Sequence, residues 1–282
     1  QCEFAVLMEG SLIWSLSLIA CLFSASASAL APNEHVGNFR LFDQLGGSHQ
    51  LHYFSDKKAV VLLVQDLSCE ASAAVDQSVS ALTKAYGESV EFFVIDPTAD
   101  RATIVASNGE SRVLVDDAQL VGRTMNLGRA GEVLIVNPEN WTLAYRGDAN
   151  DGLRSALAAV VTGEPVVQRR THASGCDIVY APTNGLEISY SDTIAPILAD
   201  NCVTCHRPGG IGPWAMTDYN MVRGFSLMMR EVLLTKRMPP WHADPTIGHW
   251  STDRSIERAA LPTLVSWIDA GPPRAEGADP LS

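Results

Sequence analysis

One CxxCH motif, formed by Cys202, Cys205 and His206, constrains this chain more than any other feature. Covalent attachment of a porphyrin needs two thiols that add to the two vinyl groups on one edge of the ring. It also needs an imidazole that follows the second thiol and reaches the iron beneath. The chain has only 6 cysteines and 7 histidines, so a chance occurrence of this spacing is rare. The motif therefore predicts one covalently attached haem c, with His206 as an iron ligand.

Two other uses of these cysteines compete with haem attachment. A dithiol redox pair normally follows a buried strand, whereas a helical pattern precedes Cys202. A zinc site would need two more ligands beside Cys205 and His206, and the sequence contains no suitable cluster. The sequence therefore favours haem over both alternatives.

Helical patterns flank the motif over residues 187–274. Ser191 is expected to cap a short helix before the motif, and Gly271 to end a helix near the C-terminus. The apolar positions of these two helices are Ile194, Ile197, Leu198, Leu261, Leu264, Val265 and Ile268. This arrangement resembles the all-α, class I (monohaem) cytochromes c. The resemblance implies that an aromatic residue of the last helix, here Trp267, packs across the first.

The resemblance also implies a second iron ligand on a loop. In small bacterial cytochromes c the distal methionine often precedes proline, and Met238 precedes Pro239 and Pro240 after a helical pattern. The prolines restrict the chain conformations that ligation would have to fix. We therefore expect Met238 and His206 to be the two metal ligands. The other candidates are Met216, His242, His249, and three methionines that more often fill a helix core, Met221, Met228 and Met229.

Further haem contacts follow from the same resemblance. Gly212 and Pro213 resemble the turn whose proline carbonyl accepts a hydrogen bond from the proximal imidazole, which would orient His206. Trp214 and Trp241 are expected to line the porphyrin, with ordinary core packing as the alternative. The expected haem-binding set is Cys202, Cys205, His206, Met238, Pro213 and Trp214.

The first half of the chain alternates strand and helix patterns. Continuous apolar runs at 59–64, 92–95 and 133–136 suit strands that are covered on both faces. A helix face recurs between the first two runs, and an edge strand at 141–146 precedes a closing helix at 153–161. This order predicts an α/β fold with helices on both sheet faces. Residues 36–165 resemble the thioredoxin-like fold in the version found in redoxins and peroxiredoxins.

That resemblance directs attention to Cys69, at the start of the first helix. A helix N-terminus there would stabilise a thiolate. Ser72 stands in place of the resolving cysteine of thioredoxins, and Asp66 in place of a peroxiredoxin threonine. Ala130 and Gly131 replace the cis-proline pair, and a glutamate beside Cys69 would raise the pKa of its thiol. We expect a degenerate scaffold or binding domain, with thiol chemistry at Cys69 as the alternative.

Residues 166–186 contain turn formers without a clear period and are expected to link the two domains. Cys176 lies in this segment. An oxidising compartment would favour a disulfide between Cys69 and Cys176. Nothing in the sequence brings the two within bonding distance, so the pairing stays open.

Residues 1–29 have the pattern of a signal peptide, with an apolar core at 11–23 followed by small residues. Cys21 also resembles the acylated cysteine of bacterial lipoproteins, and an uncleaved anchor is the third possibility. Each route predicts a periplasmic or otherwise exported protein. No apolar run beyond residue 30 reaches the length of a membrane span. The net charge of −12 argues against general affinity for nucleic acid.

The order of signal, redoxin-like domain, linker and cytochrome c resembles a bacterial family of redoxin–cytochrome c fusions. Longer members continue into a copper type II, ascorbate-dependent monooxygenase domain. The resemblance implies electron transfer to a redox protein partner through one haem, with the redoxin-like domain as scaffold or docking module. The alternatives are a thiol-dependent redox enzyme that uses Cys69, and the N-terminal part of a copper monooxygenase-type oxidoreductase.

Overall fold

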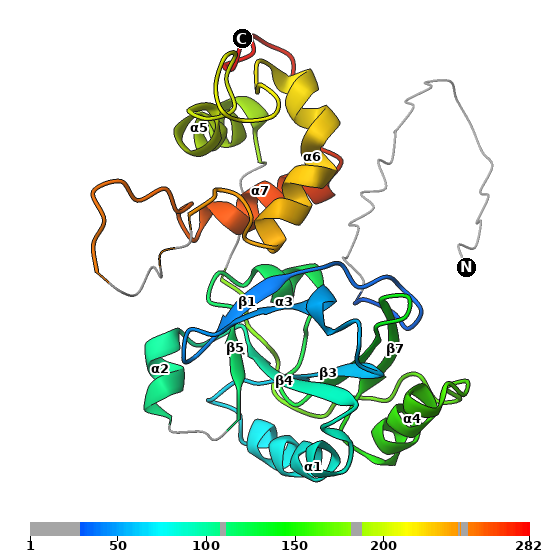
Figure 1. Ribbon diagram of the computed structural model, residues 1–282. Coiled ribbons are helices and arrows are strands. Elements are labelled where there is room, and N and C mark those ends of the chain that lie inside the picture. The colour runs from blue at the N-terminus through cyan, green and yellow to red at the C-terminus, as the bar shows by residue number, and fades with distance from the viewer. Residues whose placement is uncertain (1–28, 108–110, 182–187, 242, 244–247) are drawn as a thin grey trace, which may run out of the picture.

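The computed structural model describes residues 29–107, 111–181, 188–241, 243 and 248–282. The expected signal peptide with Cys21, and the candidate ligand His242, lie outside these residues. An α/β unit forms the lower part of Figure 1, and a helical unit lies above it. No helix in the described ranges is both long enough and apolar enough to cross a bilayer.

The α/β unit is built on one seven-stranded sheet with the strand order β2-β1-β5-β4-β3-β6-β7. Its strands are β1 (Arg40–Asp43), β2 (Ser48–Gln50), β3 (Ala59–Val64), β4 (Val90–Asp96), β5 (Val113–Val115), β6 (Val133–Asn137) and β7 (Thr142–Gly147). Strands β3, β4 and β5 run parallel, whereas β6 pairs antiparallel with β3, and β7 with β6. The sheet is therefore mixed, with its parallel strands in the centre.

Helices cover both faces of this sheet. They are the 3-10 turn η1 (Leu51–Phe54) and the helices α1 (Glu70–Tyr86), α2 (Arg101–Ala106), α3 (Leu120–Thr124) and α4 (Asp151–Thr162). Alternate side chains of β3 enter two separate cores: Leu62 packs in the core that includes Val121 of α3, and Leu63 in the core that includes Leu157 of α4. Figure 1 shows α1 and α4 on the side of the sheet opposite α3.

This arrangement confirms the predicted thioredoxin-like α/β fold. The apolar runs become β3, β4 and β6, and the edge strand becomes β7. The sequence patterns did not indicate β1, β2 or β5, because these strands span only three or four residues. Too few positions alternate in such strands to produce a periodic signal.

The segment expected to be a linker packs along the α/β unit. The backbone N–H of Arg146 in β7 donates to the carbonyl of Arg169 (3.0 Å), and that of Thr171 to the carbonyl of Arg146 (3.1 Å). Further along, the hydroxyl of Tyr180 donates to the carbonyl of Leu127 (2.6 Å). The described residues of this segment are thus an ordered part of the unit, held by irregular backbone pairing that has no sequence period.

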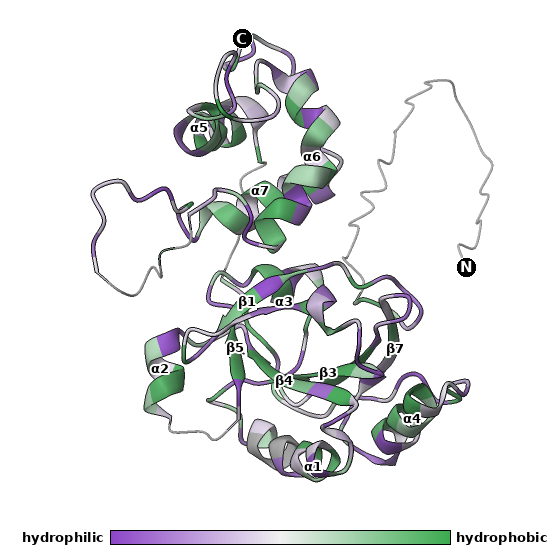
Figure 2. Ribbon diagram, in the orientation of Figure 1, coloured by the Kyte–Doolittle hydropathy of each residue, from purple (hydrophilic) through white to green (hydrophobic). Residues whose placement is uncertain are grey.

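The helical unit begins with one helical stretch that runs into the CxxCH motif. Its elements are the π-helical turn η2 (Tyr190–Ile194), α5 (Ala195–Leu198), the π-helical turn η3 (Ala199–Val203), α6 (Tyr219–Leu234) and α7 (Ala260–Asp269). Ser189, not the expected Ser191, caps this stretch, because its hydroxyl accepts the N–H of Asp192 (3.2 Å). Hydrophobic and hydrophilic residues alternate along α6 in Figure 2, as on an amphipathic helix.

The last helix crosses the first, as the cytochrome resemblance implied. Trp267 of α7 is fully buried and stacks on Tyr190 at 5.8 Å between ring centroids. The chain beyond α7 returns to the same cluster, where Asp279 accepts hydrogen bonds from the hydroxyl of Tyr190 (3.0 Å) and the N–H of Tyr219 (2.6 Å). Leu120 of α3 joins this core, so the helical unit packs on the α/β unit.

A buried ion pair organises the end of the α/β sheet. Nε and Nη2 of Arg146 donate to the two carboxylate oxygens of Glu132 at 2.6 and 2.8 Å. The remaining donors reach the carbonyls of Met125 (3.1 Å), Asn126 (2.6 Å) and Leu30 (3.3 Å). The side chain of Arg146 is only 2% exposed. Every N–H of this guanidinium therefore has an acceptor, which is what a buried charge requires.

A second buried carboxylate, Asp116, caps α3. It is 1% exposed and accepts the backbone N–H groups of Leu120 (3.0 Å), Val121 (3.3 Å) and Gly122 (2.7 Å). Burial raises the pKa of Asp116 to about 6, and this effect outweighs the hydrogen bonds, which favour the charged form. The carboxyl group therefore binds a proton more tightly in the folded chain than in the unfolded chain.

We expect Glu132→Gln to lower the free energy of unfolding by about 3 kcal/mol, because it leaves the buried Arg146 charge without its carboxylate. Urea unfolding followed by circular dichroism measures this change. The control is Asp151→Asn, which removes the exposed pair with Arg154 and should cost less than about 0.5 kcal/mol. Equal changes in the free energy of unfolding would contradict the prediction that the buried pair contributes more to stability than the exposed pair.

We expect Asp116 to make stability fall as pH rises from about 4 to about 6. The pKa of Asp116 in the folded chain lies above the ordinary aspartate value of 3.8, so the folded chain holds more protons within that window. Relative to Asp116→Asn, the wild type should lose up to about 3 kcal/mol across the window and change little above it. Unfolding curves at four pH values measure the difference, and a constant offset at every pH would contradict the raised pKa.

Candidate functional site

The CxxCH motif lies on one tight turn at the end of η3. The backbone N–H groups of Cys205 and His206 both donate to the carbonyl of Cys202, at 3.1 and 2.9 Å. Both cysteines are free thiols of intermediate exposure, and His206 is buried. The turn thus presents two thiols and one imidazole from five consecutive residues, as haem attachment requires.

A backbone carbonyl fixes the proton of His206. Nδ1 of His206 lies 3.0 Å from the carbonyl oxygen of Trp214. A carbonyl can only accept, so Nδ1 carries the proton and Nε2 keeps its lone pair. The expected acceptor was the carbonyl of Pro213, one residue earlier, and the sequence-based assignment is wrong by that one position.

The loop that carries Trp214 is fixed on both sides of the histidine. The N–H of Gly212 donates to the carbonyl of Cys205 (2.9 Å), and the N–H of Met216 to the carbonyl of His206 (2.8 Å). These two bonds set the register that brings residue 214, rather than 213, opposite the ring. A Cβ on Gly212 would lie 2.8 Å from Nδ1 of His206, so the close approach of this loop requires glycine.

An aromatic pair lies beside His206. Trp214 lies 5.1 Å from the His206 ring and stacks on Phe225 of α6 at 4.2 Å. Met221 and Met228, expected in a helix core, are exposed, whereas Met229 is buried as expected. Among the described residues of the helical unit, the exposed large apolar side chains are Ile211, Met221, Leu227, Met228, Met238 and Trp250.

Met238 lies on a separate loop after α6. Its N–H donates to the carbonyl of Val232 (3.2 Å), its peptide bond to Pro239 is cis, and its side chain is partly exposed. Trp241 makes an edge contact with Trp250, at 6.4 Å. The contacts of the motif bring Cys202, Cys205, His206 and Trp214 together, and Met238 as the second iron ligand stays a prediction.

The donor set fits a haem on the side of His206. Burial raises the pKa of Cys202 to about 11, so at neutral pH the side chain is a thiol. A protonated thiol is a poor nucleophile for disulfide exchange, which weighs against a dithiol redox pair here. In the described ranges no three Cys, His, Asp or Glu side chains form a group that could hold a bare metal ion, so the zinc alternative gains no support.

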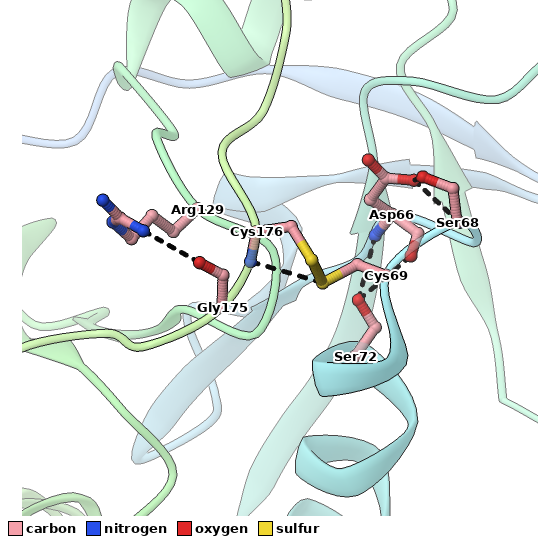
Figure 3. Close-up of a disulfide and its surroundings, with 7 residues drawn as sticks. All are labelled: Asp66, Ser68, Cys69, Ser72, Arg129, Gly175 and Cys176. Carbon is pink, nitrogen blue, oxygen red and sulfur yellow. Dashed lines mark hydrogen bonds between the residues drawn. A yellow bond between two sulfur atoms is a disulfide. The ribbon is translucent and has the colours of Figure 1, made fainter.

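A second reactive group lies in the α/β unit, where Cys69 and Cys176 form a disulfide (Figure 3). Their Cα atoms are 6.0 Å apart although 107 residues separate them in sequence. The pairing that the sequence left open is therefore present. The sequence did contain one signal, since these two cysteines are the only ones between the proposed signal peptide and the CxxCH motif.

The substituted positions around Cys69 have structural roles. The hydroxyl of Ser72 donates to the carbonyl of Asp66 (3.1 Å) and accepts its N–H (3.2 Å). The carboxylate of Asp66 accepts both the N–H (2.8 Å) and the hydroxyl (2.6 Å) of Ser68. These bonds, visible in Figure 3, hold the turn that places Cys69 at the N-terminus of α1.

Residues 174–178, which we call the strap, hold Cys176 against the loop before β6. The N–H of Ala130 donates to the carbonyl of Cys176 (2.9 Å), and the N–H of Ile178 to the carbonyl of Gly128 (3.0 Å). Arg129 donates to the carbonyl of Gly175 (2.9 Å). The strap thus pairs with the region where Ala130 and Gly131 replace a cis-proline.

Comparison with known proteins finds similarity to solved structures alone. No model of a known protein family matches the chain, and no curated protein matches it. A hypothetical protein from Sinorhizobium meliloti is similar at 18% identity and a TM-score of 0.48, covering 55% of this chain and 97% of that one. The peroxidoxin BcpB from Mycobacterium tuberculosis is similar at 16% identity and a TM-score of 0.39, and the match covers 47% of this chain and 97% of that one. A putative thiol:disulfide interchange protein DsbE from Chlorobium tepidum is similar at 12% identity and a TM-score of 0.41, and the match covers 47% of this chain and 99% of that one.

Proposed function

We propose that this chain carries one covalently attached haem c and transfers electrons through it. The observation that carries the proposal is the bond between Nδ1 of His206 and the Trp214 carbonyl, at 3.0 Å. It leaves Nε2 as the nitrogen that can bind iron, and it sets the orientation of the ring. Cys202 and Cys205 present two free thiols on the same turn for the thioether bonds.

The residues of the helical unit have distinct roles in this proposal. Haem, when bound, supplies a one-electron couple between Fe(II) and Fe(III). His206 would hold the iron from one side, and its hydrogen bond to Trp214 makes the imidazole a stronger donor. The stacked pair of Trp214 and Phe225 shields the imidazole from water. Met238 is the proposed ligand on the other side.

The α/β unit serves in this proposal as scaffold or docking module for a redox protein partner. We place the protein in the periplasm or another exported location, with a lipid anchor at Cys21 as an open alternative. The Cys69–Cys176 disulfide supports this location, because disulfides persist in oxidising compartments.

Thiol–disulfide exchange in the α/β unit is a second candidate function. The disulfide itself favours it, because Cys69 starts α1, where a helix N-terminus stabilises a thiolate. The absence of a resolving cysteine at Ser72 does not exclude exchange, since Cys176 supplies the partner sulfur. The two functions involve different units of the chain and can be tested separately.

We expect haem to remain attached through acid–acetone extraction when the protein is exported with a cytochrome c maturation system. The pyridine haemochrome spectrum should be of the c type, and Cys202→Ser together with Cys205→Ser should abolish covalent attachment. The matched control replaces the other pair, Cys69→Ser with Cys176→Ser, and should retain the full haem content. Haem that extracts freely from the wild type would overturn the proposed function.

We expect Met238→Ala to remove the weak sulfur-to-iron band of the ferric protein, to permit CO binding and to lower the reduction potential. A thioether stabilises ferrous iron, so its loss favours the ferric state. Visible spectra and a redox titration measure these changes. Met228→Ala is the control, because Met228 is another partly exposed methionine of the same unit. If the band persists in Met238→Ala and is lost in Met228→Ala, the second ligand is Met228.

A further inference from the structure

The two cysteines of the Cys69–Cys176 disulfide differ in residue exposure. Cys69 is only 4% exposed, whereas Cys176 belongs to the exposed residues of the strap. Disulfide exchange requires an incoming thiolate to reach one sulfur atom from outside. Accessibility therefore directs attack to Sγ of Cys176 and makes Cys69 the leaving group.

The helix N-terminus at Cys69 favours a leaving thiolate, whereas the burial of Cys69 and the neighbouring Glu70 oppose its negative charge. Cys69 is the N-cap of the 17-residue helix α1, whose N-terminus carries a partial positive charge. In the oxidised chain the sulfur of Cys69 already accepts the N–H of Cys176, at 3.3 Å. A stable leaving thiolate speeds disulfide exchange. The helix N-terminus at Cys69 and the exposure of Cys176 therefore favour the same reaction, in which Cys176 is attacked and Cys69 leaves.

The strap fits its groove without room for a side chain at Gly175. A Cβ there would lie 1.6 Å from the carbonyl oxygen of Ala130, which is a backbone atom that cannot move aside. Apart from the disulfide, the strap is held by a few hydrogen bonds and by the exposed ion pair of Arg129 with Asp177 (3.2 Å). An exposed ion pair adds little stability, whereas Ile178 is buried in the core of the α/β unit. The disulfide and the buried Ile178 side chain are therefore the two main attachments of the strap.

Exposed apolar side chains lie next to the disulfide. Leu67, two residues before Cys69, is 39% exposed, and Val179, three residues after Cys176, is 78% exposed. Both line an open cavity of about 640 Å³ at the carboxyl ends of β3 and β4. Most of the other lining residues are polar, so the cavity offers a partner protein two exposed apolar side chains within a polar surface.

We propose that Cys176 is a thiol-exchange site for the dithiol of a partner protein, and that exchange releases the strap. This inference rests on the second candidate function. The partner thiolate attacks Sγ of Cys176, the bond to Cys69 breaks, and Cys69 leaves with the electron pair as a thiolate. The second partner thiol then attacks the partner sulfur of the mixed disulfide and frees Cys176. The partner loses two electrons and two protons, and Cys69 and Cys176 gain them.

Glutathione trapping tests the direction of attack on the full-length oxidised protein. Reduced glutathione is added together with iodoacetamide, and peptide mass mapping locates both labels. We expect glutathione on Cys176 and alkylation on Cys69, at least tenfold over the reverse pattern. Glutathione mainly on Cys69, or equally on both, overturns the inference while exchange itself stands. If even dithiothreitol leaves the disulfide intact, the second candidate function fails as well.

Hydrogen exchange tests release of the strap. The amides of Ala130 and Ile178 should be protected in the oxidised protein and should lose at least tenfold protection after reduction by dithiothreitol. Gly175→Ala should speed reduction at least tenfold, because the strap cannot seat. Gly224→Ala is the matched control, since a Cβ at Gly224 meets nothing within 4 Å. Amides that stay protected after reduction would show that the strap remains bound, which overturns its release.

Discussion

The guanidinium of Arg146 is the interaction on which the α/β unit depends. Its side chain joins Glu132 to the carbonyls of Met125 and Asn126, and its backbone pairs with residues 169–171. One residue of β7 thus positions both the loop before β6 and the segment that leads to the strap. Since a buried cation without acceptors is very costly, this geometry leaves the loop few alternatives. The buried Arg146 guanidinium therefore fixes the loop before β6, which is the loop that hydrogen-bonds to Cys176.

Sequence patterns predicted the elements whose residues repeat often enough. The six consecutive apolar residues of β3 form a clear run, the helix face of α1 has a clear period, and both elements appear where expected. The short strands β1, β2 and β5 and the attached course of residues 169–180 have no such period. Tertiary pairing alone determines them, as with Arg146 and Arg169. Ser189 and Ser191 are both suitable N-cap residues, and only the folded chain shows that the helix begins after Ser189.

The candidate site was predictable where chemistry fixes the spacing of residues. The two thiols and the imidazole of the CxxCH motif form one turn because they are neighbours in sequence. The carbonyl partner of His206 was assigned one residue too early, because the register depends on hydrogen bonds of Gly212 and Met216 that no motif encodes. The number of cysteines made a Cys69–Cys176 disulfide possible, but the sequence could not show that the two cysteines meet, because the folded path of the strap brings them together. Met238 remains a prediction.

The disulfide closes a covalent ring around most of the α/β unit. The ring runs from Cys69 to Cys176 and contains every helix and strand of the unit from α1 to α4, while β1, β2 and β3 lie outside it. Closing a loop of roughly 100 residues removes chain entropy from the unfolded state worth about 4–5 kcal/mol in the chain-entropy model. Opening the bond turns the ring into a linear chain and returns that entropy. The redox state of one exposed sulfur atom therefore changes the unfolding temperature of the whole unit, including strands that lie far from it in sequence.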